Sequence, residues 1–78
     1  MTEYTQSIHG DIDAVARHYE YDDSAIIVAD FGFVTGSVDV VDGTAIVVID
    51  DDQYEFDVPA GVDRAVMNNG VVSIEVER

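Results

Sequence analysis

Short runs of alternating apolar and polar residues, each closed by a turn signal, constrain the fold of this chain more than any other feature. The clearest case is residues 53–77, QYEFDVPAGVDRAVMNNGVVSIEVE. Residues 54–58 alternate Tyr, Phe and Val with acidic residues, which is the period of a strand with one solvent-facing side. Pro59 ends this run because it lacks an amide donor. Asn69-Gly70 is a strong signal for a tight hairpin turn, and Asp42-Gly43 likewise favours a two-residue hairpin turn.

Similar runs recur along the whole chain, at a spacing of roughly 8–12 residues that is typical of sandwiches and barrels. We expect strands at residues 15–21, 25–31, 37–41, 44–49, 54–58, 65–69 and 71–77. The second and fourth are apolar on both faces, as central strands are, and the first has the pattern of an edge strand with Tyr19 and Tyr21 toward the core. No run has a helical stripe. The pattern predicts an all-β, antiparallel β-sandwich of about seven strands.

The length of 78 residues predicts a single domain with a small core. We expect an N-terminal tail at residues 1–14, polar and loosely attached, followed by the sandwich at residues 15–78. Within the tail, residues 11–14 have the composition of a single helical turn. The chain contains no cysteine, no apolar run of about 18 residues and no signal-peptide pattern. These features predict a cytoplasmic protein without disulfides.

The charge balance is strongly acidic, with 17 Asp and Glu residues against three arginines and no lysine, for a net charge of −14. Nucleic acids and anionic membranes are disfavoured as partners, because phosphate contacts require Lys and Arg. Such a composition resembles the proteins of halophilic archaea. In a salt-rich cytoplasm the Debye length falls to about 3 Å at 1 M salt, so the repulsion between surface carboxylates is screened.

The C-terminal half also resembles the alpha-crystallin domain of small heat-shock proteins. Residues 65–72, AVMNNGVV, are similar to the family signature A-x-x-x-N-G-V-L, and residues 56–63, FDVPAGVD, to the preceding F-x-L-P-x-x-V-D. Residues 72–76 resemble its closing L-x-I-x-V strand, and residues 29–33, ADFGF, the D-L-P-G-F near its start, without the proline. The resemblance spans residues 19–77. It implies an immunoglobulin-like sandwich of the alpha-crystallin type or of the related CS type found in co-chaperones.

The resemblance is to a minimal version of that domain. Many small heat-shock proteins carry a long loop whose strand pairs with a neighbouring subunit, whereas only residues 50–53 separate two strands here. The sequence also shows no I-x-I anchor after the last strand, since Ile74-Glu75-Val76 lies within it. We therefore expect a monomer or small dimer rather than a large shell, and any homodimer is expected to form through an edge strand.

No set of residues indicates catalysis, so we expect neither an enzyme nor a bound cofactor. Asp50-Asp51-Asp52 has carboxylates that suit a hard cation but lacks the spacing of a calcium loop, and a solvated turn is favoured. His18, with Glu20 on the same strand face, has the residue types of a metal or acid–base pair. A single surface histidine on an edge strand is the favoured interpretation. A small enzyme or ligand carrier is therefore disfavoured.

The function implied by the resemblance is an ATP-independent chaperone of the stress response, which binds non-native polypeptide. The alternative is a CS-like adaptor that binds one folded partner. In the alpha-crystallin family a polypeptide-binding groove lies between two strands that correspond to residues 37–41 and 65–69. The candidate groove residues are Val38, Val40, Val66, Met67 and Asn68. Ordinary core and edge packing is the alternative for each of them. If the two strands are sheet edges, we expect some of these side chains to be only partly buried.

Overall fold

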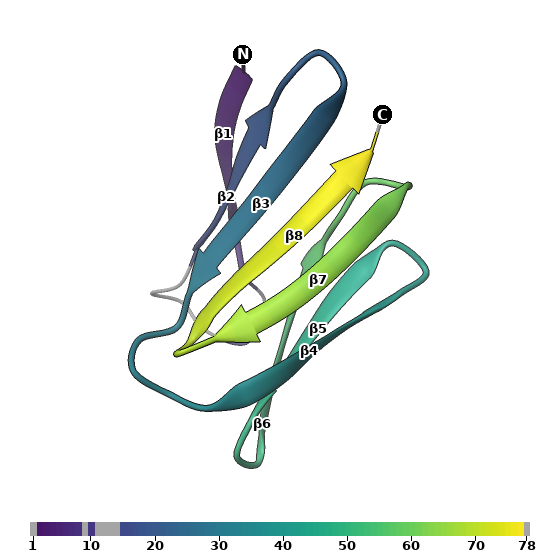
Figure 1. The fold of residues 1–78 in the computed structure, drawn as a ribbon. Coiled ribbons are helices and arrows are strands. Elements are labelled where there is room, and N and C mark those ends of the chain that lie inside the picture. Colours follow the sequence, from purple (N-terminus) through teal and green to yellow (C-terminus); the bar gives the residue numbers. More distant parts are fainter. Residues whose placement is uncertain (1, 9, 11–14, 78) are drawn as a thin grey trace.

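The described part of the chain, residues 2–8, 10 and 15–77 of this computed structural model, forms antiparallel strands and no helix (Figure 1). The strands are β1 (Thr2–Ser7), β2 (Val15–Glu20), β3 (Ser24–Asp30), β4 (Gly36–Val41), β5 (Thr44–Ile49), β6 (Asp52–Asp57), β7 (Val62–Asn68) and β8 (Val71–Glu77). The larger sheet, sheet A, has the order β1-β2-β3-β8-β7, and sheet B has the order β4-β5-β6. The predicted all-β antiparallel sandwich is confirmed, with eight described strands rather than about seven.

The core lies between the two sheets and consists of alternate residues from their central strands. In sheet A, Ile27 of β3 pairs with Ile74 of β8, and both side chains are completely buried. Val47 of β5 and Phe56 of β6 face them from sheet B and are buried as well. Each such side chain contributes about 1.5–3 kcal/mol on transfer from water to the interior. The core therefore follows the period-two pattern of the sequence.

The N-terminal segment corrects one expectation. Residues 2–7 form β1, which pairs with β2 along its whole length, rather than a loosely attached tail. Ile8 follows directly and is only 3% exposed, within the core. The backbone hydrogen bonds to β2 order this segment, and a polar sequence without a sustained period does not reveal such pairing. The single helical turn expected at residues 11–14 lies outside the described residues.

Strand β2 is oriented opposite to the expectation. Ala16 and His18 point into the core, and Tyr19 lies only partly covered on the other face, while Tyr21 follows the strand and is exposed. Ala16 pairs with Ala29 of β3, and both small side chains are completely buried. A period of two identifies two faces but does not say which of them is buried. Strand β2 is also not an edge strand, because β1 pairs with the edge of β2 that faces away from β3.

Two hairpin turns have the conformation that their sequences predict. Asp42-Gly43 joins β4 to β5 with φ angles of 49° and 79°, and Asn69-Gly70 joins β7 to β8 with φ angles of 51° and 81°. Both residues of each pair occupy the left-handed region, as the favoured two-residue hairpin turn requires. The turns thereby fix the registers of the pairs β4–β5 and β7–β8.

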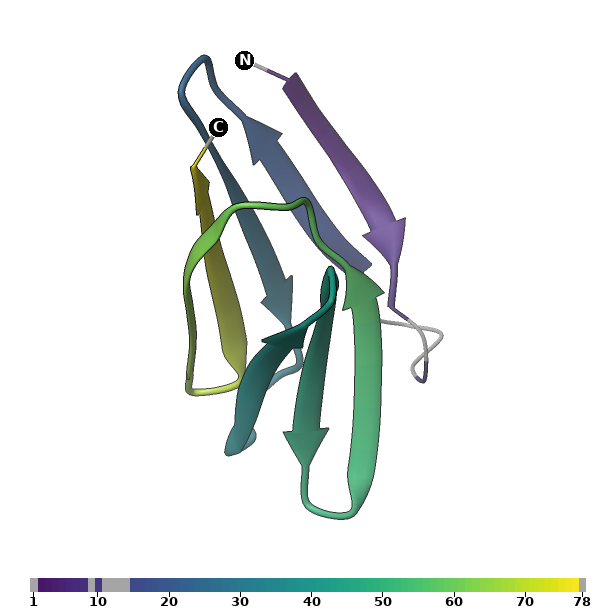
Figure 2. The same cartoon turned by 90° about the vertical axis from the view of Figure 1, so that its right-hand side faces the viewer.

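The edges of the two sheets meet on both sides of the sandwich. On one side β4 lies against β7. On the other side the end of β6 comes close to the end of β1, where Gln6 and Asp57 are hydrogen-bonded (Figure 2). Figure 1 shows β7 and β4 at the same side of the molecule, with both chain ends at the opposite end from the β7–β8 turn. None of the described residues belongs to a helix long and apolar enough to cross a membrane.

Candidate functional site

The first candidate site is the side of the sandwich where β4 and β7 meet. Each is the outermost strand of its sheet, so each has one row of backbone N–H and C=O groups that no strand within its own sheet pairs. Unpaired edges of this kind can template the addition of another strand. A register irregularity lies between Val62 and Arg64, at the start of β7. It interrupts the regular pairing there and confines the regular part of the β7 edge to residues 64–68.

Apolar side chains line the inner face of both edge strands. Val38 and Val40 of β4 pack against the core from sheet B, and Ala65 and Met67 of β7 do so from sheet A. All four are only partly buried, in contrast to the residues of the central strands. Apolar side chains therefore reach solvent along a boundary where two strand edges are also unpaired within their sheets.

The structure brings together three of the five candidate groove residues. Val38, Val40 and Met67 face inward on the two neighbouring edges. Val66 and Asn68 lie on the opposite, outer face of sheet A, since they pair with Ser73 and Val71 rather than with core residues. Partial burial was expected for some of these apolar residues, and the three valines and Met67 show it.

An acidic side chain covers part of the β4 edge. The amide of Val40 donates a hydrogen bond of 3.0 Å to Oδ1 of the adjacent Asp39. A carboxylate in this position protects an edge from uncontrolled pairing, as inward or flanking charges do in many sheets. A polypeptide that pairs with β4 at this point has to displace the Asp39 carboxylate.

The loop between β3 and β4 presents an aromatic residue that the sequence analysis did not single out. Phe33 is 102% exposed, which makes it the most exposed of the large apolar side chains described. The loop is held at the β7–β8 turn, because the amide of Phe31 donates a 2.8 Å hydrogen bond to the carbonyl oxygen of Gly70. Phe33 therefore projects near the end of the molecule where β4 begins and β7 ends. The sequence signal that could have identified Phe33 is an aromatic residue between two glycines, Gly32 and Gly36, in a predicted loop.

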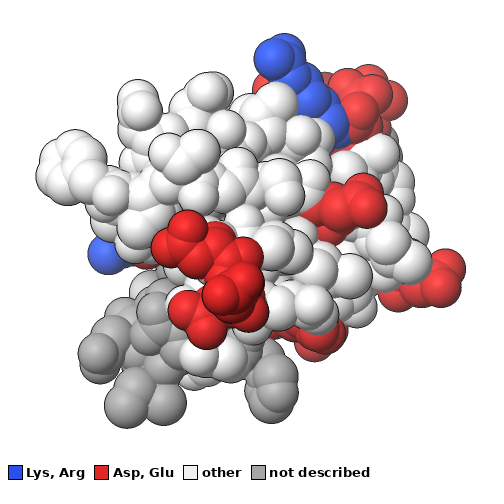
Figure 3. Space-filling view, turned by 90° about the horizontal axis from the view of Figure 1, so that it is seen from below, with Lys and Arg blue, Asp and Glu red and all other residues white. Residues whose placement is uncertain are grey.

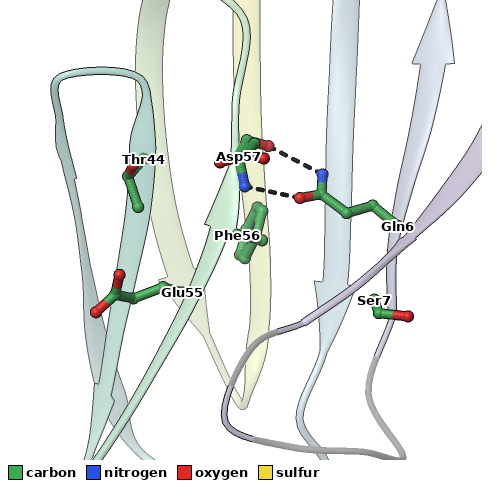
Figure 4. A pocket seen from close by; sticks show the side chains of 6 residues that line it. All are labelled: Gln6, Ser7, Thr44, Glu55, Phe56 and Asp57. Atoms are coloured by element: carbon green, nitrogen blue, oxygen red, sulfur yellow. Dashed lines mark hydrogen bonds between the residues drawn. The ribbon is translucent and has the colours of Figure 1, made fainter.

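The opposite side of the sandwich is closed by the side chain of Gln6, from β1. Its carbonyl oxygen Oε1 accepts a 2.7 Å hydrogen bond from the amide of Asp57 in β6, and its Nε2 donates to the Asp57 carbonyl oxygen at 3.0 Å (Figure 4). The primary amide thus makes the two bonds that a paired strand residue would make. Gln6 joins sheet A to sheet B and occupies the edge of β6 at that residue.

His18 completes this contact from β2. Its Nε2 lies 2.8 Å from Nε2 of Gln6, and its ring stacks on Tyr4 with a centroid distance of 4.4 Å. The bonds to Asp57 fix the orientation of the Gln6 amide, so Nε2 of Gln6 is the donor and His18 accepts. The neutral ring therefore carries its proton on Nδ1. His18 is 4% exposed, which corrects the expected surface histidine on an edge strand.

The environment of His18 disfavours its charged form. Burial away from water lowers the pKa of His18 below its ordinary value of 6.5, and the negative charge of Glu20 partly opposes this shift. The pairing of His18 with Glu20 for metal or acid–base chemistry was the disfavoured alternative, and Nε2 of His18 is instead engaged by Gln6. Among the described residues, no group of three or more His, Asp or Glu side chains is placed to hold a metal ion.

A pocket of about 290 Å³ opens beside the Gln6 contact (Figure 4). It is lined by Gln6, Ser7, Thr44, Glu55, Phe56 and Asp57. Two carboxylates and no cation lie in its wall, and the amide of Gln6 is engaged by Asp57. The described wall therefore offers the hydroxyl groups of Ser7 and Thr44 together with carboxylates, and its charge is negative.

Comparison with models of protein families gives a match over nearly the whole chain. The sequence model of a family of unknown function (DUF7127) matches residues 1–76, which is nearly the whole chain. No curated protein and no solved structure matches the chain.

Proposed function

We propose that this chain, which belongs to the DUF7127 family of unknown function, is an ATP-independent, chaperone-like domain that binds non-native polypeptide. One observation carries the proposal: β4 and β7, the edges of different sheets, lie side by side with partly buried apolar side chains between them. A bound segment would add to one edge through its backbone and place alternate side chains against Val38, Val40 and Met67. The site thus supplies backbone pairing together with an apolar surface.

The sandwich is proposed to be of the alpha-crystallin or CS type. The support is the motif at residues 65–72, which forms β7 and the turn into β8, and the adjacency of that strand to β4. The acidic composition supports a salt-rich cytoplasm as the working environment, because a charge of −14 is tolerated best where it is screened.

A CS-like adaptor that binds one folded partner is the second candidate. The fully exposed Phe33 favours it, since a single projecting aromatic side chain fits a defined pocket on a partner. A Phe33→Ser variant separates the two candidates. It should abolish capture of a specific partner, whereas the suppression of aggregation should persist if the β4–β7 edges alone bind non-native chains.

The test of the edge site uses two neighbouring residues of β4. Val40 faces the core boundary, and Val41 points to the other side of the same strand and is 48% exposed. In 1 M KCl, Val40→Asp should abolish the suppression of client aggregation, whereas Val41→Asp should leave it unchanged. Thermal unfolding of both variants shows whether they fold. Because Val40 is partly buried, Val40→Thr provides a milder change, with an expected partial loss of activity.

The proposal is wrong if folded Val40→Asp protein suppresses aggregation as well as the parent. It is also wrong if Val41→Asp, at the exposed position, causes the same loss.

A further inference from the structure

The outward-facing residues of sheet A form a flat surface, here called the outer face. Cross-strand pairing aligns ten of them in two rows that cross all five strands, and others, such as Asp30 and Glu77, lie on the same face beyond these rows. The first row is Glu3, Tyr19, Ile26, Glu75 and Arg64, and the second is Thr5, Arg17, Val28, Ser73 and Val66. Both rows are centred on β3, the middle strand of the sheet.

The centre of the outer face is apolar. Ile26 and Val28 lie there, although the opposite face of β3 already supplies Ile27 and its neighbours to the core. A strand that is apolar on both faces is typical of sheets covered on both sides. Sheet B covers one side of β3, and no described segment covers the other. The sequence of β3 is therefore that of a strand whose outer face is also buried.

The charges of the outer face differ from those of the remaining surface. Arg17 and Arg64 are the only basic residues in the described part of the chain, and both lie on this face, beside Glu3 and Glu75. The outward face of sheet B is also apolar at Ile46 and Val48 of β5, but it carries Asp39, Glu55 and Asp57 without a cation.

The end of the molecule in Figure 3 shows the same imbalance. Asp and Glu recur there in separate groups, and basic residues appear only at its margins. Of the described surfaces, the outer face is therefore the one that offers positive charge to a partner as acidic as this chain.

We infer that the outer face is the contact surface of a symmetric dimer, in which a second copy of the chain packs face to face with its twofold axis along β3. This axis places β1 over β7 and β2 over β8 of the partner subunit. Glu3 then lies opposite Arg64 of the partner subunit, and Arg17 lies opposite Ser73 and next to Glu75 of the partner subunit. Ile26 and Val28 meet their own counterparts at the axis, as in any isologous interface. The exposed Asp30 at the end of β3 also faces its own counterpart, and this repulsion is screened at high salt.

The charges discriminate between the twofold arrangements. An axis across the strands would place Arg17 opposite Tyr19 and Arg64 opposite Val66 of the partner subunit, without a complementary pair. The axis along β3 places Glu3 opposite Arg64 of the partner subunit in the first row, and it brings Arg17 of the second row next to Glu75 of the partner subunit. Two sheets packed in this way keep their strands within about 30° of each other, which leaves the long Glu and Arg side chains within reach.

The size of the face sets the expected strength of the dimer. Five strands spaced by about 4.8 Å and six residues long at about 3.3 Å each give a projected area of about 480 Å². Because both copies bury this area, the interface totals about 960 Å², which is near the lower limit for a specific interface, and a weak dimer is expected. Each copy carries a charge of −14, and the repulsion between copies is screened only at high salt. The dimer should therefore form in molar salt and dissociate in dilute buffer.

The experiment is sedimentation equilibrium of the full chain in 1 M KCl, with charge reversal at one pair. The parent should be a dimer. Arg64→Glu, at an exposed position, places two glutamates opposite each other and should weaken dimerisation at least tenfold. Adding Glu3→Arg to this variant restores the pair with reversed polarity and should restore the dimer. The double variant has the net charge of the parent, so recovery reports on the pair itself.

A matched variant controls for the added charge. Thr35→Asp with Ser37→Asp adds the same two negative charges at exposed positions outside the outer face and should leave the dimer intact. Thermal unfolding confirms that each variant is folded. A parent that is monomeric in 1 M KCl at hundreds of micromolar overturns the inference. So does a dimer that Arg64→Glu leaves unaffected, or one that the double variant does not restore. The dimer involves neither Val40 nor Val41. If the dimer is not found, the aggregation test of the β4 edge is therefore unaffected, and the two failures can be told apart.

Discussion

At the scale of single residues, Gln6 and His18 determine how one side of the sandwich closes. Gln6 makes bonds to Asp57 that a neighbouring strand would otherwise make, and it donates to a neutral His18. If His18 gains a proton, its Nε2–H points at an N–H of Gln6. The contact that joins β1 to β6 then loses a hydrogen bond and becomes repulsive.

The first prediction follows from the lowered pKa of His18. In the unfolded chain the histidine has a pKa near 6.5, whereas in the folded protein its pKa is lower. Between these two values the unfolded state binds more protons, so stability falls as the pH decreases through 6.5 and the loss levels off below the folded pKa. In 1 M KCl the melting temperature should be lower at pH 5.5 than at pH 7.5.

Two variants check the origin of this dependence. His18→Leu removes the titrating group and should flatten the melting temperature between pH 5.5 and 7.5, whatever its effect on absolute stability. His9→Gln replaces the other histidine and should leave the dependence intact. If His18→Leu keeps the full slope, the buried histidine is not its source.

At the scale of elements, the β7–β8 turn has a role beyond its hairpin. The carbonyl oxygen of Gly70 accepts from Phe31, and a Cβ on Gly70 would overlap the carbonyl oxygen of Gly32. The turn and the β3–β4 loop are therefore in backbone contact at this position. This contact fixes the loop that presents Phe33.

The second prediction compares two glycines of that contact. Gly32 and Gly70 both have positive φ, 88° and 81°, but a Cβ on Gly32 would meet no atom within 4 Å. Gly32→Ala should cost about 1–2 kcal/mol, from backbone conformation alone. Gly70→Ala adds the overlap with the loop backbone and should cost at least about 3 kcal/mol in total. Urea unfolding in high salt measures both. Equal losses would show that the loop moves away without cost.

At the scale of the whole molecule, the net charge of −14 on a chain of 78 residues dominates stability. Only two cations lie in the described part of the chain, so carboxylates over most of the surface have no oppositely charged neighbour. In dilute buffer their repulsion extends over about 10 Å, which is a large fraction of the molecule, and at 1 M salt over only about 3 Å.

The third prediction is that the melting temperature rises markedly from 0.05 M to 2 M KCl. Screening of the repulsion between carboxylates should provide most of the increase below 1 M, and choline chloride should act similarly to KCl over that range because screening depends on ionic strength. Differential scanning calorimetry at low protein concentration separates this effect from dimer formation, which depends on concentration. A melting temperature independent of salt would contradict both the screening argument and the proposed salt-rich environment.

The sequence alone determined the local features, because they depend on a few neighbouring residues. Asp42-Gly43 and Asn69-Gly70 form the predicted turns since those residue types tolerate positive φ, and the alternation at residues 71–77 predicts the buried side of β8. The all-β architecture follows from the repetition of such segments. In each case the signal is local and the physical cause is a backbone preference or a period of two.

Only the tertiary structure decided how these strands face and meet one another. Both faces of β2 carry residues that could be buried, and the pairing with Ala29 and the bond to Gln6 place Ala16 and His18 inside. Alternation along β7 puts Val66 and Met67 on opposite faces, but only the packing of the sheets shows that Met67 is the one that faces the core. The pairing of β7 with β8 also aligns Arg64 with Glu75. Pairing energy depends on contacts between residues far apart in the chain, and a polar segment such as β1 gains its order from the neighbour it pairs with.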